Sequence, residues 1–345
     1  MPQPKTVLVT GASGFIAKHI CLRLLNAGYH VVGSVRTAER GPEVVAAVSP
    51  YLDSQEGLSA RLITVTLDLD RDDGWREALN GIDILIHTAS PFPMGQPEDE
   101  QSVIRPAVEG TLRALRAARS AGVSRVVMTS STVAIMNTAL PPGRTVYDEN
   151  DWSDLTRPTA IPYVKSKTLA EQAAWRFVEE EAREIALTVV NPAFVLGPPL
   201  DNHLGTSLLV IRRLLRSKDP ALPNIGFASV DVRDIAEMHV RALSSPETVG
   251  RRIIGSDRFF WFLDMAKTLA AAYPDRKIAA RRAPNWLVRI LALFDKPVRS
   301  IVPNLDERLD LSNQLARDLL GMEFMDVEQS LLESAGYLIE HGLDR

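Results

Sequence analysis

The stretch Thr6-Val7-Leu8-Val9-Thr10-Gly11-Ala12-Ser13-Gly14-Phe15-Ile16-Ala17 decides the fold of this chain. Its first five residues form a short apolar, β-branched run that ends at a glycine, a pattern typical of a strand buried on both faces. After the glycines, Ile20, Leu24 and Leu25 follow a helical period that closes at Gly28. A strand, a glycine turn and a helix in this order predict a binding site for the phosphates of a dinucleotide.

The glycine turn supplies the conformations that such a site needs. Gly11 can take the tight turn and Gly14 lets the backbone approach a pyrophosphate, while Ser13, Phe15 and Ile16 lead into the helix N-terminus with its free N–H groups. The spacing G-x-x-G-x-x-A differs by one residue from G-x-G-x-x-G, so a purely structural turn is the alternative.

The second strand, expected over His30–Val35, predicts which dinucleotide binds. Arg36 follows this strand, where chains that bind NAD place an acidic residue for the ribose 2′-hydroxyl. An arginine can pair with a 2′-phosphate through two hydrogen bonds, so NADP(H) is favoured over NAD(H). Arg40 is a second candidate for the phosphate, and its alternative is a solvated helix residue.

Strands and helices continue to alternate, which predicts a doubly wound parallel Rossmann sheet of the α/β class. The further strands are expected over residues 61–67, 82–87, 125–129 and 185–191, and long helices over 99–121 and 163–182. Beyond residue 192 this rhythm weakens and helices dominate. We therefore expect an NADP-binding domain over 1–192, onto which 225–255 folds back, and a smaller, mostly helical substrate-binding domain over 193–224 and 256–345.

The carboxyl ends of the strands carry further candidate residues, because open α/β sheets bind ligands there. Asp68 and Leu69 follow the third strand, where an adenine ring would lie. The small residues Thr88, Ala89 and Ser90 follow the fourth strand and would let the cofactor pass close to the chain.

Ser131, Tyr163 and Lys167 form the expected catalytic set. Tyr163 and Lys167 are four residues apart and share a helical face, so the lysine charge would lower the pKa of the phenol, assisted by the nicotinamide. Tyr163 would donate a proton to a substrate oxygen that Ser131 holds by a hydrogen bond. Ser130 is the alternative serine, and a Tyr–Lys pair at this spacing also occurs on ordinary amphipathic helices.

The composition is that of an ordinary globular protein. The chain has 345 residues, 46% of them hydrophobic, and its formal net charge of −4 without a long basic run argues against nucleic-acid binding. Apolar runs are too short to span a membrane and the start lacks a signal-peptide pattern, so we expect a cytoplasmic protein. Six scattered histidines and one cysteine, Cys21, predict no metal site, and Cys21 is expected to be buried in the core.

Several motifs together resemble the extended short-chain dehydrogenases/reductases, most closely the dihydroflavonol-4-reductase-like branch with its methylglyoxal, ketone and phenylacetaldehyde reductases. The motifs are Thr10-Gly-Ala-Ser-Gly-Phe-Ile-Ala17, His87-Thr-Ala-Ser-Pro-Phe92, Val127-Met-Thr-Ser-Ser131, Tyr163-x-x-x-Lys167, Asn191-Pro-Ala-Phe-Val195 and Asp231-Val-Arg-Asp-Ile235. The resemblance implies NADP(H), favours Ser131 over Ser130 and adds cofactor contacts from Thr129, Tyr163, Lys167, Pro192, Phe194 and Val195.

Departures from relatives within this resemblance narrow the substrate. Met136 replaces the asparagine of plant dihydroflavonol reductases, and Ala160-Ile161-Pro162-Tyr163 replaces the Lys-Asn-Trp-Tyr of cinnamoyl-CoA reductases. The segment after Ser131 also lacks the Val-Tyr-Gly of sugar-nucleotide epimerases. An apolar pocket is therefore expected for a hydrophobic or aromatic substituent, with plain core packing as the alternative role of its residues, which are Phe92, Met136, Phe194 and Leu196.

The function predicted from these residues is reduction of small aldehydes or ketones by NADPH, reversible as an alcohol dehydrogenase. A sugar-nucleotide epimerase/dehydratase or a hydroxysteroid dehydrogenase is the alternative enzyme, and a non-catalytic NADP-binding sensor the alternative from another class. A monomer or homodimer is expected.

Overall fold

The computed structural model describes residues 4–91 and 99–345, and its main element is a seven-stranded sheet whose strands are all parallel. From edge to edge the strands are β10 (Arg252–Gly255), β7 (Ala186–Pro192), β5 (Arg125–Thr129), β4 (Ile84–His87), β1 (Thr6–Thr10), β2 (His30–Val35) and β3 (Leu62–Thr66). The strand order reverses between β1 and β4, so the sheet is doubly wound as predicted.

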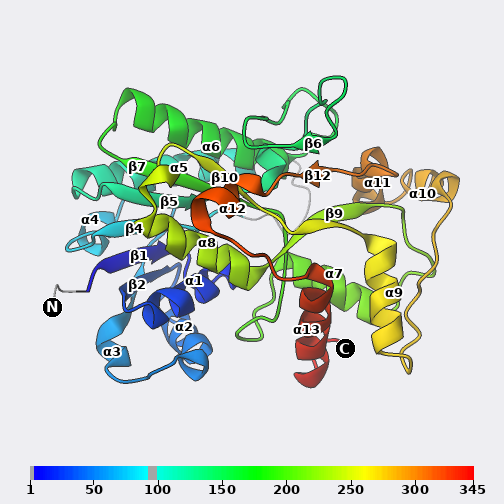
Figure 1. Cartoon of the computed structure of the whole chain (residues 1–345), viewed down its shortest axis with the longest axis horizontal. Helices are drawn as coiled ribbons and strands as arrows, with labels where there is room; N and C mark the ends of the chain where they lie inside the picture. Colours follow the sequence, from blue (N-terminus) through cyan, green and yellow to red (C-terminus); the bar gives the residue numbers. More distant parts are fainter. Residues whose placement is uncertain (1–3, 92–98) are drawn as a thin grey trace.

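Helices cover both faces of this sheet (Figure 1). In β1, Val7 and Val9 pack with the helices on one face and Leu8 with those on the other, because successive strand residues point to opposite sides. One face is covered by α1 (Phe15–Asn26), α2 (Arg40–Val48) and α8 (Val232–Ser244), and the other by α4 (Trp75–Ala78), α5 (Gln101–Ser120) and α6 (Pro162–Glu180). Cys21 is fully buried on α1, as expected, and burial raises the pKa of its thiol to about 12.

A second, smaller sheet forms beside the first. Its strands are β11 (Arg258–Trp261), β9 (Gly226–Asp231) and β8 (Phe194–Leu196), in that order. It shares a separate hydrophobic core with α7 (Thr206–Leu215), α9 (Phe262–Ala272) and α13 (Val327–Glu340). In Figure 1 these helices lie at the end of the molecule away from the N-terminus.

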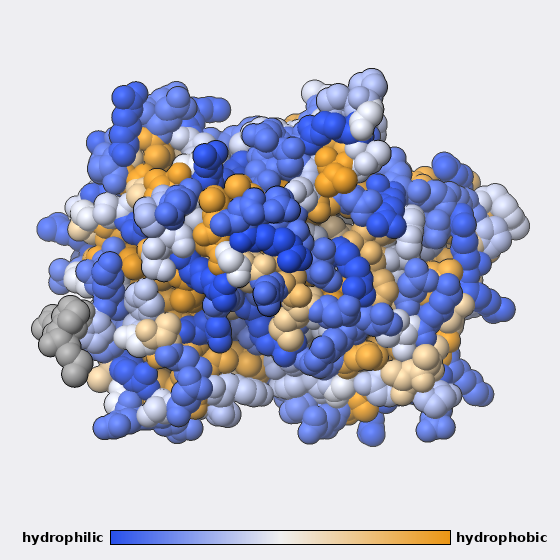
Figure 2. Space-filling model, in the orientation of Figure 1, coloured by the Kyte–Doolittle hydropathy of each residue, from blue (hydrophilic) through white to orange (hydrophobic). Residues whose placement is uncertain are grey.

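The remaining elements are short. They are α3 (Leu58–Arg61), α10 (Asn285–Leu291), α11 (Lys296–Ile301), α12 (Gln314–Leu320), the strand pair β6 (Val146–Tyr147) and β12 (Asp310–Leu311), and the 3-10 turns η1 (Ser49–Tyr51), η2 (Thr132–Ala134), η3 (Pro246–Thr248) and η4 (Val302–Asn304). Hydrophilic residues dominate the face of the molecule seen in Figure 2, with hydrophobic ones in smaller areas between them. In the described ranges, no helix is long and apolar enough to cross a membrane.

The predicted strands and long helices agree with the structure to within two residues at most boundaries, but two segments of the second half lie elsewhere than predicted. β9 falls within 225–255 yet pairs with β8 and β11 of the second sheet, and α12 packs back against α8 and β10. Periodicity indicates which residues of an element are buried but not which partner buries them, so these two placements could not be read from it. For the rest, the division into two domains stays a proposal.

A buried ion pair joins α6 to β10. The Glu171 carboxylate is fully buried and accepts a hydrogen bond of 2.5 Å from Arg252 Nε, and the Arg252 side chain is only 7% exposed. The other oxygen of Glu171 accepts from Ser130 Oγ and Asn191 Nδ2, at the ends of β5 and β7. This arrangement satisfies the charges, which a buried ion pair requires if it is to be tolerated.

Arg252 extends the connection to the loop before α6. Its guanidinium donates to the carbonyl groups of Glu149, Asp151 and Ala134, and it lies 3.7 Å from the centre of the Trp152 ring. One buried pair thus holds together α6, three strand ends and two loops.

We expect Glu171→Gln and Arg252→Met each to lower the free energy of unfolding by about 3–5 kcal/mol, because each leaves an uncompensated buried charge or donor set. The double variant should lose clearly less than the sum of the two. Urea unfolding measures all three.

Arg119→Gln is the matched control, since Arg119 pairs with Glu184 at 2.8 Å on the surface with both side chains about half exposed. It should cost less than about 1 kcal/mol. Equal effects of Glu171→Gln and Arg119→Gln would contradict the role assigned to the buried pair.

Candidate functional site

Hydrogen bonds around Thr10, the last residue of β1, connect the carboxyl ends of three neighbouring strands, β2, β1 and β4. The Thr10 hydroxyl oxygen accepts hydrogen bonds from the backbone N–H groups of Thr88 and Ala89, each at 3.1 Å, and contacts His87 Nδ1 at 2.9 Å. Ser34, near the end of β2, accepts from Gly11 N through Oγ and from Ala12 N through its carbonyl oxygen. The glycine turn is therefore held between the carboxyl ends of β2 and β4, at the reversal of strand order.

The two glycines of this turn have different roles. Gly11 has a φ of +66°, and a Cβ there would lie 3.0 Å from the Ala89 Cα, so a side chain would be both strained and crowded. Gly14 precedes α1 as its N-cap, with extended backbone and without a side chain to cap the helix. The first N–H groups of α1, beginning at Phe15 and Ile16, are thus left for a bound anion, which fits a pyrophosphate.

Two arginines stand where a 2′-phosphate would bind. Arg36 directly follows β2 and is exposed. Arg40, the first residue of α2, donates from Nε to Glu43 at 3.1 Å, but one of its terminal nitrogens is buried and lacks a hydrogen-bond partner among the described residues. An orphaned buried guanidinium nitrogen is costly unless a ligand pairs with it. The pair therefore fits an adenosine that carries a 2′-phosphate.

Other residues predicted to contact the cofactor lie at or near the carboxyl ends of the strands. Asp68 and Leu69 follow β3, and Leu69 packs against Gly110 of α5. Ser90 follows β4, Pro192 ends β7 and Val195 lies in β8, where it is buried. The Thr129 hydroxyl instead contacts His239 Nε2 of α8 at 2.7 Å, so this hydroxyl is engaged on the face of the sheet that α8 covers.

The catalytic candidates come from β5 and α6. Ser131 follows β5 and caps η2, where its Oγ accepts from Val133 N at 3.3 Å. Tyr163 is the second residue of α6, whose first residue Pro162 has a φ suited to a helix start. The Ser131 and Tyr163 side chains are hydrogen-bonded to each other. Ser130, by contrast, donates to Glu171 at 2.5 Å and is occupied by that bond.

The pKa shifts of Tyr163 and Lys167 are set mainly by burial. Burial raises the pKa of Tyr163 above its ordinary value, and the hydrogen bond with Ser131 acts against this rise. This direction is opposite to the lowering predicted for a phenol beside both Lys167 and a nicotinamide, which stays a prediction for the protein with its cofactor. Burial lowers the pKa of Lys167 to about 8, against the raising effect of Glu171. A desolvated lysine exerts less of the expected influence because its own charged form is destabilised.

His87 is a buried, neutral residue behind this group. Burial, followed by the charge of Lys167, lowers the pKa of its imidazole to about 3. The Thr10 hydroxyl already accepts two backbone N–H bonds, so its proton is free to point at Nδ1. The packed role expected for His87 agrees with this position, although its buried Nε2 has no partner among the described residues.

The residues expected to line an apolar substrate pocket have different environments. Phe92 lies outside the described residues. Met136 is half-buried just after η2, and Phe194 is half-buried with its ring stacked on Phe227 at 4.6 Å. Leu196 is fully buried in the second hydrophobic core, a position that favours packing over substrate contact.

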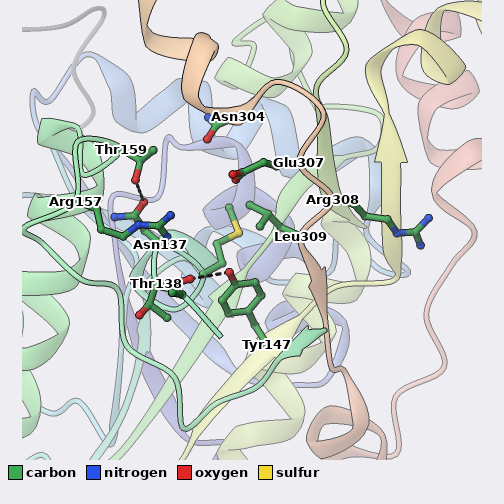
Figure 3. A pocket seen from close by; sticks show the side chains of 11 residues that line it. Asn137, Thr138, Tyr147, Arg157, Thr159, Asn304, Glu307, Arg308 and Leu309 are labelled. Carbon is green, nitrogen blue, oxygen red and sulfur yellow. Dashed lines mark hydrogen bonds between the residues drawn. The ribbon is translucent and has the colours of Figure 1, made fainter. Parts of the chain in front are cut away.

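A pocket of ≈ 240 Å³ opens beside Met136, and most of its lining is polar (Figure 3). Arg157, Asn137 and Thr159 lie together on one side of it, and Glu307 lies on the other. The sequence motifs include none of the polar residues that line this pocket. Residues 304–309 reach the pocket only through tertiary packing.

The sequence analysis also did not predict that the loop after β8 packs against the start of α1, next to the glycine turn. Lys18 of α1 is buried and pairs with Asp201 at 2.5 Å, in the loop after β8. At the end of that loop, Gly205 packs so closely on Phe15 that a Cβ would lie 2.9 Å from the ring. The loop is thereby held against the start of α1. Only the glycine before α7 hinted at a close approach in the sequence.

Comparisons with known proteins show the family to which the chain belongs. A model of the NAD dependent epimerase/dehydratase family matches residues 7–254. The chain is 34% identical to cinnamoyl-CoA reductase 1 of Arabidopsis thaliana, over 99% of this chain and 91% of that protein. It is 30% identical to the NADPH-dependent methylglyoxal reductase GRE2 of Saccharomyces cerevisiae, over 97% and 98% of the two chains.

Among solved structures, the yeast methylglyoxal/isovaleraldehyde reductase Gre2 complexed with NADPH superposes with a TM-score of 0.79 at 27% identity, covering 98% of this chain and 99% of that one. The family model spans most of the sheet that carries the glycine turn and the Ser131, Tyr163 and Lys167 group. The chain belongs to the NAD-dependent epimerase/dehydratase family, with extended short-chain dehydrogenases/reductases as its relatives.

Proposed function

We propose that this protein reduces aldehydes and ketones with NADPH, and that it runs in reverse as an alcohol dehydrogenase. The hydrogen bond between Ser131 and Tyr163 at the carboxyl end of β5, with Lys167 one helical turn further, is the observation that carries the proposal. Relatives named as an NADPH-dependent methylglyoxal reductase and a cinnamoyl-CoA reductase support a carbonyl substrate. Arg36 and the unpaired nitrogen of Arg40 support the 2′-phosphate of NADP(H).

When bound, NADPH supplies the hydride that carbonyl reduction requires. Tyr163 supplies the proton from its phenol, and its raised pKa keeps that proton in place at neutral pH. Ser131 donates a hydrogen bond to the substrate oxygen as negative charge develops on it. Lys167 binds the ribose of the cofactor and stabilises the tyrosinate that forms when the proton leaves.

The alternatives predict different substrates. A sugar-nucleotide epimerase/dehydratase or a hydroxysteroid dehydrogenase would use the same side chains, whereas a sensor would bind NADP(H) without turnover. The protein is therefore incubated with NADPH and, in turn, aldehydes, ketones, a steroid ketone and cinnamoyl-CoA, while nicotinamide absorbance is followed. It is also incubated with a UDP-sugar and NAD(P)⁺, and the sugar product is separated by chromatography because its formation consumes no cofactor. Turnover of the sugar nucleotide with no oxidation of NADPH by the carbonyl compounds would overturn the proposal.

Replacing Tyr163 by Phe tests the proton donor. The variant should lose about 10²–10⁴-fold in kcat, because a positioned general acid contributes that much, while its Kd for NADPH stays close to that of the unmodified protein. Stopped-flow absorbance and NADPH fluorescence measure the two quantities. An active Tyr163→Phe protein would rule out the mechanism.

Replacing Arg36 by Ala tests the assignment of the cofactor. Loss of charge-assisted bonds to the 2′-phosphate should raise the KM for NADPH by about 10–100-fold and leave the KM for NADH unchanged. NADH serves as the internal control because it lacks the phosphate. A preference for NADH in the unmodified protein, or an unchanged preference in the variant, would contradict NADP(H).

The pH dependence of reduction should report Lys167. Its pKa of about 8 means that the ammonium is charged below this pH and neutral above it, whereas Tyr163 stays protonated throughout. We therefore expect kcat/KM for the carbonyl compound to be level below pH 8 and to fall above it. In Lys167→Arg the charge persists, so the fall should move upward by more than one pH unit. A fall at the same pH in both proteins would assign it to another group.

A further inference from the structure

The polar pocket beside Met136 is built from the two chain segments that lead to the catalytic residues. Residues 136–139 continue from Ser131 through η2, and residues 157–159 precede Tyr163. The third wall, 304–309, comes from the C-terminal part of the chain (Figure 3). Thr159 is four residues before Tyr163, so their Cα atoms are at most about 15 Å apart. This distance is within the length of one extended small-molecule substrate.

Arg157 is the cation of the pocket that is available to a ligand. Its side chain is half-buried, and within residues 4–91 and 99–345 no acceptor forms a hydrogen bond or ion pair with its guanidinium. The neighbouring Asp154 carboxylate accepts from the Thr156 N–H and hydroxyl groups, and these bonds, with a smaller contribution from the Arg157 charge, lower its pKa. A partly desolvated guanidinium gains most from a carboxylate that can accept two parallel hydrogen bonds.

Arg308 lines the same pocket but is already paired. Its Nε donates to Asp310 at 2.7 Å, and its guanidinium lies 5.5 Å from the centre of the Phe259 ring. In Figure 3 its charged end points away from the residues around Asn137. It therefore adds little attraction for an anion inside the pocket.

The other walls limit what fits beside Arg157. Asn137 is held by Asp154 and Thr159, and the Tyr147 hydroxyl donates to the Thr138 carbonyl at 2.8 Å. Glu307 brings an exposed carboxylate to the opposite wall, where water screens its repulsion. Met136 and Leu309 provide apolar surface for the stem of a ligand.

We propose that this pocket is a second part of the substrate site, in which Arg157 binds a carboxylate carried by the carbonyl substrate at its end remote from the carbonyl group. The proposal rests on the carbonyl reductase activity proposed above. The sequence predicted an apolar substrate pocket, whereas the pocket proposed here would select oxo acids over their neutral analogues.

The test compares a length series of ω-oxo carboxylic acids with their methyl esters, with NADPH saturating. The unmodified protein should show a lower KM for the acid at the length that spans the site. Arg157→Gln should raise the KM for that acid by about 10–100-fold and leave kcat and the ester unchanged. Arg157→Lys should retain part of the preference, since the charge remains.

Two further variants serve as controls. Arg308→Gln removes the same charge from the pocket rim and should leave the preference intact, because that guanidinium is paired with Asp310. Glu307→Gln removes an exposed like charge that water already screens, so it should lower the KM for the acid by less than about twofold. Calorimetry of the ω-hydroxy acid binding to the protein with NADP⁺ gives a readout that needs no turnover.

Equal KM values for acid and ester, or a preference that survives Arg157→Gln, would overturn the carboxylate site while esters are still reduced. If no ester or acid is reduced but the hydroxy acid binds in an Arg157-dependent way, the proposed reductase activity fails and the carboxylate site stands. Loss of the preference in Arg308→Gln as strongly as in Arg157→Gln would also contradict the assignment.

Discussion

The buried ion pair between Glu171 and Arg252 is the contact on which the arrangement of the candidate catalytic residues depends. Glu171 lies one helical turn beyond Lys167, so the pair fixes the rotation of α6 relative to the sheet. Its second oxygen binds Ser130, which leaves Ser131 as the serine that meets Tyr163. A charge removed from water tolerates few arrangements, because every lost partner leaves an expensive unpaired group.

The cofactor side is organised in a comparable way by short polar contacts between strand ends. Thr10 and Ser34 tie the glycine turn to β4 and β2, and Gly11 fits only because Ala89 comes so close. The Lys18–Asp201 pair then holds the loop after β8 against α1. Both halves of the site thus meet at one edge of the sheet, where the parallel strands end.

Burial governs the charges around the candidate catalytic residues. It raises the pKa of Tyr163 and lowers those of Lys167 and His87, so each group is moved toward its neutral form. A neutral phenol suits the delivery of a proton to a carbonyl oxygen. The cost is that Lys167 is more easily deprotonated than an exposed lysine.

The sequence by itself determined the Rossmann sheet, the glycine turn and the Tyr163–Lys167 face, because these follow from strand and helix periodicity and from local spacing. Motif spacing likewise picked out Arg36, Ser131 and the class of cofactor. Only the tertiary structure decided that β9 joins the second sheet and that Ser130 is engaged by Glu171. It also decided that Arg157 and Glu307 line one pocket, since they are far apart in the chain and meet only through packing. The direction of the Tyr163 pKa shift was decided in the same way, because desolvation depends on everything that surrounds the phenol and outweighed its hydrogen bond.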